Sequence, residues 1–356
     1  MRKIKGLSKT KLILAASALV ACIIFLIIRG VCISSVNKMS DQHMGERWSH
    51  EGGAAQVSAF LRFDSLTSPD DLGYVEYQLL ESFSQESIEV TSANPSARLI
   101  ASCYSAGGSI SVYSEYGKVD LSAIGVGGDF FLFHEEDLIC GSYISADDWN
   151  QDYCILDESA AWKLFGSSDI AGQIIYVGNI PLIVKGVVKM PDSNIYKRAG
   201  LKNDFCFITY DFLLENGTAE GVSTYEVVMP NPVPGYAISK LQKYINASND
   251  AVVLVDNTTR FGFINLLKNL KDIKYRAMDL SQVAYPYWEN VARYELDRLS
   301  VLTLIYLIFA TYAIIMLVVI IVILIVVNRD GIAYLFKKLF SDIREFLVSK
   351  TRREEF

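Results

Sequence analysis

The chain has 356 residues, of which 51% are hydrophobic and 21% are charged, and its formal net charge is −7 at neutral pH. This apolar share, together with a positive mean hydropathy of +0.25, is high for a water-soluble protein and points to segments that cross a membrane. The acidic balance argues against nucleic-acid binding.

Two long apolar runs lie near the ends of the chain. Residues 12–28 carry no charge, and residues 301–327 have only threonine and tyrosine hydroxyls as polar side-chain groups. A membrane-spanning helix needs roughly 17–25 apolar residues, so both runs are long enough. Basic residues precede the first run and follow the second, which predicts cytoplasmic termini. We therefore predict a cell-membrane protein with a cytoplasmic N-terminus (1–11), a first span (12–33), an extracytoplasmic domain (34–298), a second span (299–327) and a cytoplasmic tail (328–356).

The first run has an alternative interpretation, because residues 19–22 (Leu-Val-Ala-Cys) resemble a lipobox. In a lipoprotein the signal peptide is cleaved there and Cys22 is lipidated. Residues 23–28 are all apolar, whereas a lipoprotein normally continues with a polar tether. An uncleaved span is therefore the favoured interpretation.

The region between the spans opens with a strand and a helix. Residues 57–63 have strand-like composition, and Ser68 followed by Pro69 predicts a helix start, because serine caps helices and proline fits their first turn. Apolar residues then recur at helical spacing and give this helix one buried face. Three further strands, each bounded by glycine or polar turn residues, are predicted over 97–103, 109–113 and 119–126.

The far end of the region repeats this order, with a strand, a helix and a strand predicted over 225–229, 236–245 and 251–255. A long insertion separates the two passages. The insertion is predicted to contain a strand over 154–156 and a helix over 158–165 that ends at Gly166. A hairpin of 173–177 and 182–188 is predicted around Gly178 and Asn179. The fold class is therefore α+β, with a split β-α-β lobe whose helices cover one face and an inserted β-rich lobe over about 132–200.

The predicted outer region contains four cysteines. They permit three disulfide pairings, among which the sequence does not choose. Buried free thiols are the simpler interpretation, because a domain of this size does not need covalent cross-links. The four residues are Cys103, Cys140, Cys154 and Cys206.

The segment ILDESAAWKLFGSSDIAGQIIYVGNIPLIVKGVVKMP resembles the central motif of the MacB-like periplasmic core domain, and the preceding GVGGDFF and LICGSYIS fit the same family. The resemblance implies a porter-like lobe with an inserted lobe, carried by the membrane subunit of a MacB/FtsX-type ABC transporter whose motion is driven by a partner ATPase. The residues that carry the motif are structural, not catalytic: Leu164, Phe165, Gly166, Gly172, Gly186 and Val187.

The chain departs from the family pattern in its number of spans. Family permeases usually have four spans, whereas two are predicted here. We therefore expect an accessory or split subunit that assembles with an ABC-type ATPase and a second permease polypeptide, as a dimer or hetero-oligomer. The competing hypothesis is a membrane-anchored extracytoplasmic sensor or scaffold that binds a ligand without transport.

Two segments near the second span are candidates for coupling. Tyr285, Pro286, Tyr287 and Trp288 precede the span and are predicted to form a hinge; anchoring of aromatic residues at the membrane interface explains them equally well. The tail is predicted to form an amphipathic helix that lies on the inner leaflet of the membrane. The alternative is that this helix docks to an ATPase. Its apolar stripe includes Leu335, Phe336, Leu339, Phe340 and Ile343.

The sequence offers little catalytic chemistry. His43, His50 and His134 lack metal-ligand spacing, and the charged run 134–137 is interpreted as a solvated loop. No glycine-rich phosphate loop occurs, so the energy for transport must come from a partner. We therefore predict no enzyme activity, cofactor or metal site.

Overall fold

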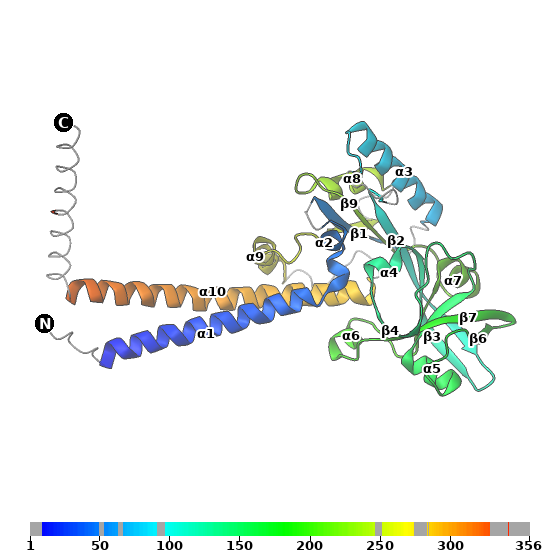
Figure 1. Cartoon of the computed structure of the whole chain (residues 1–356), viewed down its shortest axis with the longest axis horizontal. Coiled ribbons are helices and arrows are strands. Elements are labelled where there is room, and N and C mark those ends of the chain that lie inside the picture. The colour runs from blue at the N-terminus through cyan, green and yellow to red at the C-terminus, as the bar shows by residue number, and fades with distance from the viewer. Residues whose placement is uncertain are drawn as a thin grey trace, which may run out of the picture. The chain divides into compact units, whose positions relative to one another are not determined.

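The computed structural model describes residues 9–49, 53–62, 67–90, 97–245, 251–273, 283, 285–327 and 341. The chain divides into two compact units. Residues 35–300 form the first, called here the core domain, and residues 1–34 with 301–356 form the second, called the terminal unit. Helices α1 (Lys9–Asn37) and α10 (Tyr287–Val327) belong in part to each unit (Figure 1).

The terminal unit contains the two apolar segments expected from the sequence. Within the described chain, α1 and α10 are the helices long and apolar enough to cross a membrane. The rings of Phe25 and Tyr306 pack edge to face at 5.7 Å between centroids, and the Tyr312 hydroxyl lies 3.2 Å from Ser17 Oγ. Most large apolar side chains of both segments are exposed, which suits a lipid environment better than water.

A mixed sheet, ten-stranded in the described residues, forms the centre of the core domain. The strand order is β10-β1-β9-β2-β3-β8-β5-β7-β4, and β6 pairs with β2 and β7. The β3–β8 and β5–β7 pairs are parallel, and the other pairs are antiparallel. Strands of the insertion thus continue the same sheet. The bounds are β1 Ala54–Leu61, β2 Ala101–Tyr113, β3 Lys118–Gly128, β4 Asp137–Gly141, β5 Tyr153–Asp157, β6 Ile174–Val177, β7 Ile180–Lys189, β8 Phe205–Thr209, β9 Thr224–Pro230 and β10 Val252–Asp256.

Helices cover both faces of this sheet. On one face α3, α5, α7 and α8 enclose a core that includes Leu79 and Phe83. On the other, α2, α4 and the first turn of α10 enclose a second, aromatic core that includes Phe130, Phe207 and Trp288. The expectation of helices on one face was therefore wrong, because short helices and the base of α10 cover the second face. The bounds are η1 Ser40–Gln42, α2 Met44–Trp48, α3 Pro69–Gln85, α4 Phe130–Phe133, α5 Glu158–Phe165, α6 Asn194–Arg198, α7 Tyr210–Asn216, α8 Tyr236–Tyr244 and α9 Phe263–Asp272.

Several local predictions are confirmed, as is the α+β class. Helix α3 begins with a capping box, in which Ser68 Oγ accepts from the Asp71 backbone N–H at 3.3 Å and the Asp71 carboxylate accepts from the Ser68 backbone N–H at 2.9 Å. Helix α5 ends at Gly166, which has a φ of 69°. The β6–β7 hairpin turns at Gly178, which also has a positive φ.

The family-motif residues lie in the core or at close backbone approaches. Leu164 and Val187 are fully buried, and Phe165 packs against the first core. Gly172 has a positive φ. A Cβ atom on Gly186 would lie 2.9 Å from the Ser142 carbonyl oxygen, so the approach of this loop to β7 requires glycine.

The predicted break between strands 97–103 and 109–113 was wrong. One strand, β2, runs from Ala101 to Tyr113, and Gly107 and Gly108 pair in register with β3. A Cβ atom on Gly108 would lie 3.2 Å from the Ala219 backbone nitrogen. Here glycine allows the segment at Ala219 to approach the strand closely and does not mark a turn.

The cysteines of the core domain are free thiols. Cys103, Cys154 and Cys206 are buried, and Cys140 is half-buried. The structure thus has the buried-thiol arrangement and none of the three disulfide pairings.

Candidate functional site

Polar side chains are buried where α10 begins. On strands β1 and β9, side chains alternate between the two faces of the sheet, and Ser58 and Glu226 point toward the second core. Each is 1% exposed. Burial of a carboxylate without partners is costly, so its contacts define the site.

Glu226 is paired with His134, which follows α4 and is 4% exposed. The other carboxylate oxygen of Glu226 accepts from Ser58 Oγ at 2.6 Å, and Ser58 Oγ accepts from Asn257 Nδ2 at 2.8 Å. Burial opposes charge on both groups, yet Glu226 raises the pKa of His134 above its usual value and His134 lowers the pKa of Glu226. Each partner therefore favours the charged form of the other.

The interpretation of residues 134–137 as a solvated loop was wrong for His134. Its partner Glu226 lies 92 residues further along the chain, so adjacent residues give no sign of the pair.

A second ion pair fixes the base of α10. Arg260 follows β10, and its Nη1 and Nη2 atoms donate to the two carboxylate oxygens of Glu289 at 2.7 and 2.8 Å. Arg260 also donates to Gln42 Oε1 at 3.0 Å, and Arg293 Nε donates to Glu289 at 2.8 Å. Arg260 and Glu289 are 8% and 1% exposed. A bidentate geometry of this kind sets orientation as well as energy.

The two ion pairs form one continuous system. Asn257 donates to Ser58 and accepts from Arg260 Nη1 at 3.4 Å, which links the pair on β9 to the pair on α10. The buried polar network thus connects α4, β9, β1, the loop after β10, η1 and α10. Its members are Gln42, Ser58, His134, Glu226, Asn257, Arg260 and Glu289.

Gln56 ties the segment that follows α1 to the sheet. Its Nε2 donates to the Asp41 carbonyl at 2.7 Å, and its Oε1 accepts from the Met44 backbone N–H at 2.9 Å. Gly45 approaches so closely that a Cβ atom there would lie 3.2 Å from the Gln56 backbone nitrogen. The chain segments leading from α1 and into α10 are both anchored at this site.

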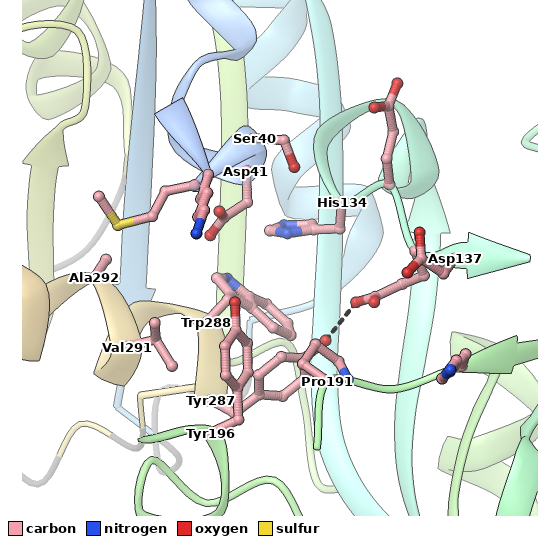
Figure 2. A pocket seen from close by; sticks show the side chains of 15 residues that line it. Ser40, Asp41, His134, Asp137, Pro191, Tyr196, Tyr287, Trp288, Val291 and Ala292 are labelled. Carbon is pink, nitrogen blue, oxygen red and sulfur yellow. Dashed lines mark hydrogen bonds between the residues drawn. The ribbon is translucent and has the colours of Figure 1, made fainter. Parts of the chain in front are cut away.

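A pocket of about 170 Å³ opens beside the network (Figure 2). Asp41, His134, Glu136, Tyr287 and Trp288 contribute to its lining. The Tyr287 hydroxyl donates to Glu136 Oε1 at 2.6 Å. Burial raises the pKa of Glu136 to about 7 and also raises the pKa of Asp41. These carboxyl groups therefore hold protons closer to neutral pH than exposed ones do.

We expect Glu136→Gln to stabilise the core domain at pH 8. The folded-state pKa of Glu136 exceeds its unfolded value of 4.5, so ionisation lowers stability as pH rises from 4.5 to about 7. Glutamine keeps an acceptor for Tyr287 without the charge, and the gain should be about 1–3 kcal/mol at pH 8 and vanish near pH 4.5. Thermal unfolding of the full chain in detergent measures it. Exposed Glu115→Gln is the control, and an equal gain there would contradict the assignment.

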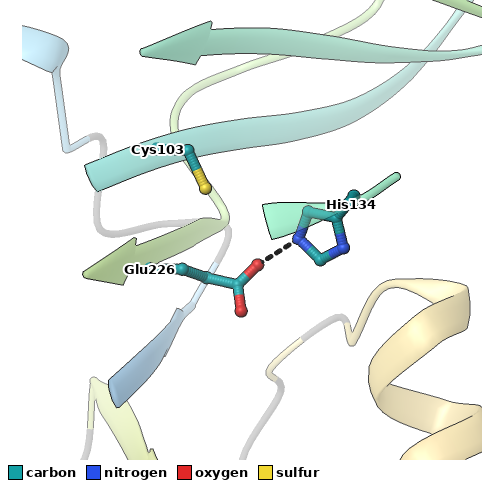
Figure 3. Close-up of side chains that lie close together, drawn as sticks. All are labelled: Cys103, His134 and Glu226. Carbon is teal, nitrogen blue, oxygen red and sulfur yellow. Dashed lines mark hydrogen bonds and ion pairs between the residues drawn. The ribbon is translucent and has the colours of Figure 1, made fainter. Parts of the chain in front are cut away.

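Cys103, His134 and Glu226 could hold a transition metal, since their ligand atoms lie within 4.8 Å of one another (Figure 3). Sulfur, nitrogen and oxygen donors together suit Zn²⁺. In the structure, however, His134 and Glu226 bind each other, and burial raises the pKa of the Cys103 thiol well above its usual value. The three side chains are satisfied as an ion pair beside a neutral thiol.

The predicted hinge residues lie against this site. Tyr287 and Trp288 are 7% and 4% exposed and pack in the second core, so they are not displayed toward lipid. Tyr285 packs on Phe60, and the Arg293 guanidinium lies 3.5 Å from its ring centroid. Pro286 directly precedes α10. The predicted tail residues lie outside the described part of the chain: Leu335, Phe336, Leu339, Phe340 and Ile343.

The network itself was missed at the level of sequence. One available signal was the polar residues Gln56, Ser58 and Glu226 at alternate positions of otherwise apolar strands. In a sheet covered on both faces, such residues indicate buried polar contacts. Their partners Arg260 and Glu289 carry no comparable local signal.

The chain is similar to known membrane-transport proteins. Residues 12–248 match the family model of the MacB-like periplasmic core domain. Two macrolide export ATP-binding/permease proteins MacB match over 22% of this chain: that of Pasteurella multocida is 30% identical over 79 residues, and that of Chromobacterium violaceum is 40% identical over 81. The matches cover 12% and 13% of those relatives' own length.

Solved structures of similar domains include two from transporters. The extracellular domain of the noncanonic ABC-type transporter YknZ from Gram-positive bacteria has a TM-score of 0.36 and 16% identity, covering 56% of this chain and 99% of that chain. The periplasmic region of MacB from Actinobacillus actinomycetemcomitans has a TM-score of 0.39 and 14% identity, covering 63% and 94%.

Proposed function

Because the chain belongs to the MacB-like periplasmic core domain family, as its motifs predicted, we propose that it is a membrane subunit of an ABC-type transporter complex. It is permease-like or accessory, and it transmits motion driven by a partner ATPase to the core domain. The observation that carries this proposal is helix α10. Glu289 of the buried polar network and the apolar run from Val301 belong to one helix.

The proposed topology places the core domain outside the cell membrane and both termini in the cytoplasm. It is supported by the apolar character of α1 and α10 and by the basic residues that flank the two spans in the sequence. We keep as part of this proposal the boundaries that the sequence predicts, a domain over 34–298 with an inserted lobe over about 132–200. A cysteine-accessibility assay on intact cells tests this topology, using Ser111→Cys on the exposed part of β2.

Mechanically, the core domain would respond to α10 through two stable arrangements. The buried polar network holds the base of α10 against the sheet, and Tyr285 and Pro286 directly before it are the proposed hinge. A closely packed interface changes between discrete states and does not deform continuously. Nucleotide binding in the partner would shift the population between these states.

The energy source would be an ABC-type ATPase subunit, with a second permease polypeptide completing the membrane bundle. The matched relatives are named ATP-binding/permease proteins, which supports an ATPase in the complex. We expect the tagged full chain, purified in mild detergent, to retain an ABC ATPase. Recovery of the chain alone, after crosslinking in intact membranes, would count against the proposal.

A second candidate function is a membrane-anchored binding module. The polar pocket beside α10, with Asp41, Glu136 and Trp288 in its lining, favours it. Deletion of the tail from residue 331 onward discriminates the two, since it should abolish function if the tail docks an ATPase and leave ligand binding intact in an anchored module.

A further inference from the structure

Helix α9 has two different sides. Leu266 and Asn269 are 6% and 5% exposed and face the protein. Phe263 and Ile264 are 48% and 67% exposed, although isoleucine and phenylalanine are usually buried in water-soluble domains. At helical spacing Ile264 lies near Lys268 and Lys271 (268 and 271 are four and seven residues on), and both lysines are also exposed.

The contacts of α9 place it beside the last turn of α10 that belongs to the core domain, residues 297–300. Asn269 Nδ2 donates to Asp297 Oδ1 at 2.9 Å and to Ser300 Oγ at 3.0 Å. Ser300 directly precedes Val301, and from there to Val327 the helix carries no charged side chain. The three contacting residues, Asn269, Asp297 and Ser300, all belong to the core domain, so these contacts of α9 do not depend on the other unit.

From this arrangement we infer that α9 lies on the membrane surface, with Phe263 and Ile264 among lipid chains near the headgroups and Lys268 and Lys271 at lipid phosphates. A helix with exposed large apolar residues flanked by lysines is typical of the bilayer interface. The partner is anionic phospholipid, because Lys268 and Lys271 are both exposed on α9, whereas the chain as a whole has a net charge of −7. The inference rests on α10 as a membrane span and not on ATPase coupling.

This surface contact would bear directly on the buried polar network. Arg260 lies three residues before Phe263, and the Thr259 carbonyl accepts from Asn265 Nδ2 of α9 at 2.7 Å. Lipid that holds α9 would therefore also restrain the loop that carries Arg260. The membrane surface becomes a third anchor of the network, beside the segments after α1 and at the start of α10.

Photocrosslinking tests the inference on the full chain in nanodiscs that contain phosphatidylglycerol. A benzophenone amino acid at position 264 should form lipid adducts, measured by mass spectrometry, at several times the yield of the same group at position 77. Tyr77 is the matched control, since it is 62% exposed on α3. Position 314 in the apolar run of α10 reports whether that helix contacts lipid. Adducts at 314 without an excess at 264 over 77 would overturn the inference and leave the span intact.

A charge variant tests the chemistry of the partner. Lys268→Gln with Lys271→Gln should lower the adduct yield at 264 several-fold in phosphatidylglycerol nanodiscs and leave the yield in phosphatidylcholine unchanged. Lys118→Gln with Lys202→Gln removes the same charge from exposed sites elsewhere and should have no effect. Equal losses from the two variants, or an unchanged yield after the first, would show that α9 does not bind lipid phosphates. Copurification of an ATPase, which tests the proposed function, does not depend on the result of either lipid experiment.

Discussion

Arg260→Met should destabilise the core domain by about 3–5 kcal/mol, because it leaves the Glu289 carboxylate buried without its bidentate partner. Arg293 still donates to Glu289 at 2.8 Å, which places the expected loss toward the lower end. For a domain of this size the melting temperature should fall on the order of 10 °C. Thermal unfolding of the full chain in detergent measures this change.

A double-variant cycle separates the ion pair from the packing of its side chains. Arg260→Met with Glu289→Met should recover much of the lost stability, because apolar residues of similar volume often replace a buried ion pair at little cost. Arg98→Ala is the matched control. Its pair with Asp129 is half exposed on the arginine side, and its loss should cost at most about 1 kcal/mol. If Arg260→Met cost no more than Arg98→Ala, the network would not hold α10.

His134→Leu should also cost about 3–5 kcal/mol near pH 6, since Glu226 then keeps its buried charge without its ionised partner. His43→Leu is the control, because His43 pairs with a mostly exposed Glu46. The loss in His134→Leu should shrink at low pH, where Glu226 becomes protonated. An equal effect of the two variants would contradict a structural role for the buried pair.

The same pair predicts the direction of pH dependence. The pKa of His134 is raised in the folded state, so its contribution is complete below an unfolded pKa of about 6.5 and is lost as pH rises through the higher folded pKa. The pKa of Glu226 is lowered, so its contribution is complete above about pH 4.5 and is lost as pH falls through the lower folded value. Wild-type stability should therefore be highest between about pH 4.5 and 6.5, and this maximum should be weaker in His134→Leu.

Features that depend on neighbouring residues were predictable from the sequence. The helix start at Ser68, the helix end at Gly166 and the hairpin turn at Gly178 each follow from the chemistry of a few adjacent residues. The motif around these glycines also identified the family, which the match over residues 12–248 confirms.

Features that depend on distant pairing were not predictable. Glu226 meets His134 across 92 residues and Ser58 across 168, and one sequence carries no information on which distant residues meet. A turn was predicted at Gly107 and Gly108, because the close approach of Ala219 to Gly108 is a tertiary contact that the sequence does not show. Membrane-interface anchoring was one interpretation of Trp288. The sequence does not show its burial, because that burial depends on packing against α4.

In the proposed mechanism, the continuity of α10 would make the core domain sensitive to bilayer thickness. The run from Val301 to Val327 is roughly 40 Å long at about 1.5 Å per residue, which exceeds a hydrocarbon core of ~30 Å. Hydrophobic mismatch of this size is relieved chiefly by helix tilt, and the tilt changes with acyl-chain length. In the proposed topology, shorter or longer lipids would therefore alter the load at Glu289 without any nucleotide, and the resting state of the protein would vary with the composition of the membrane around it.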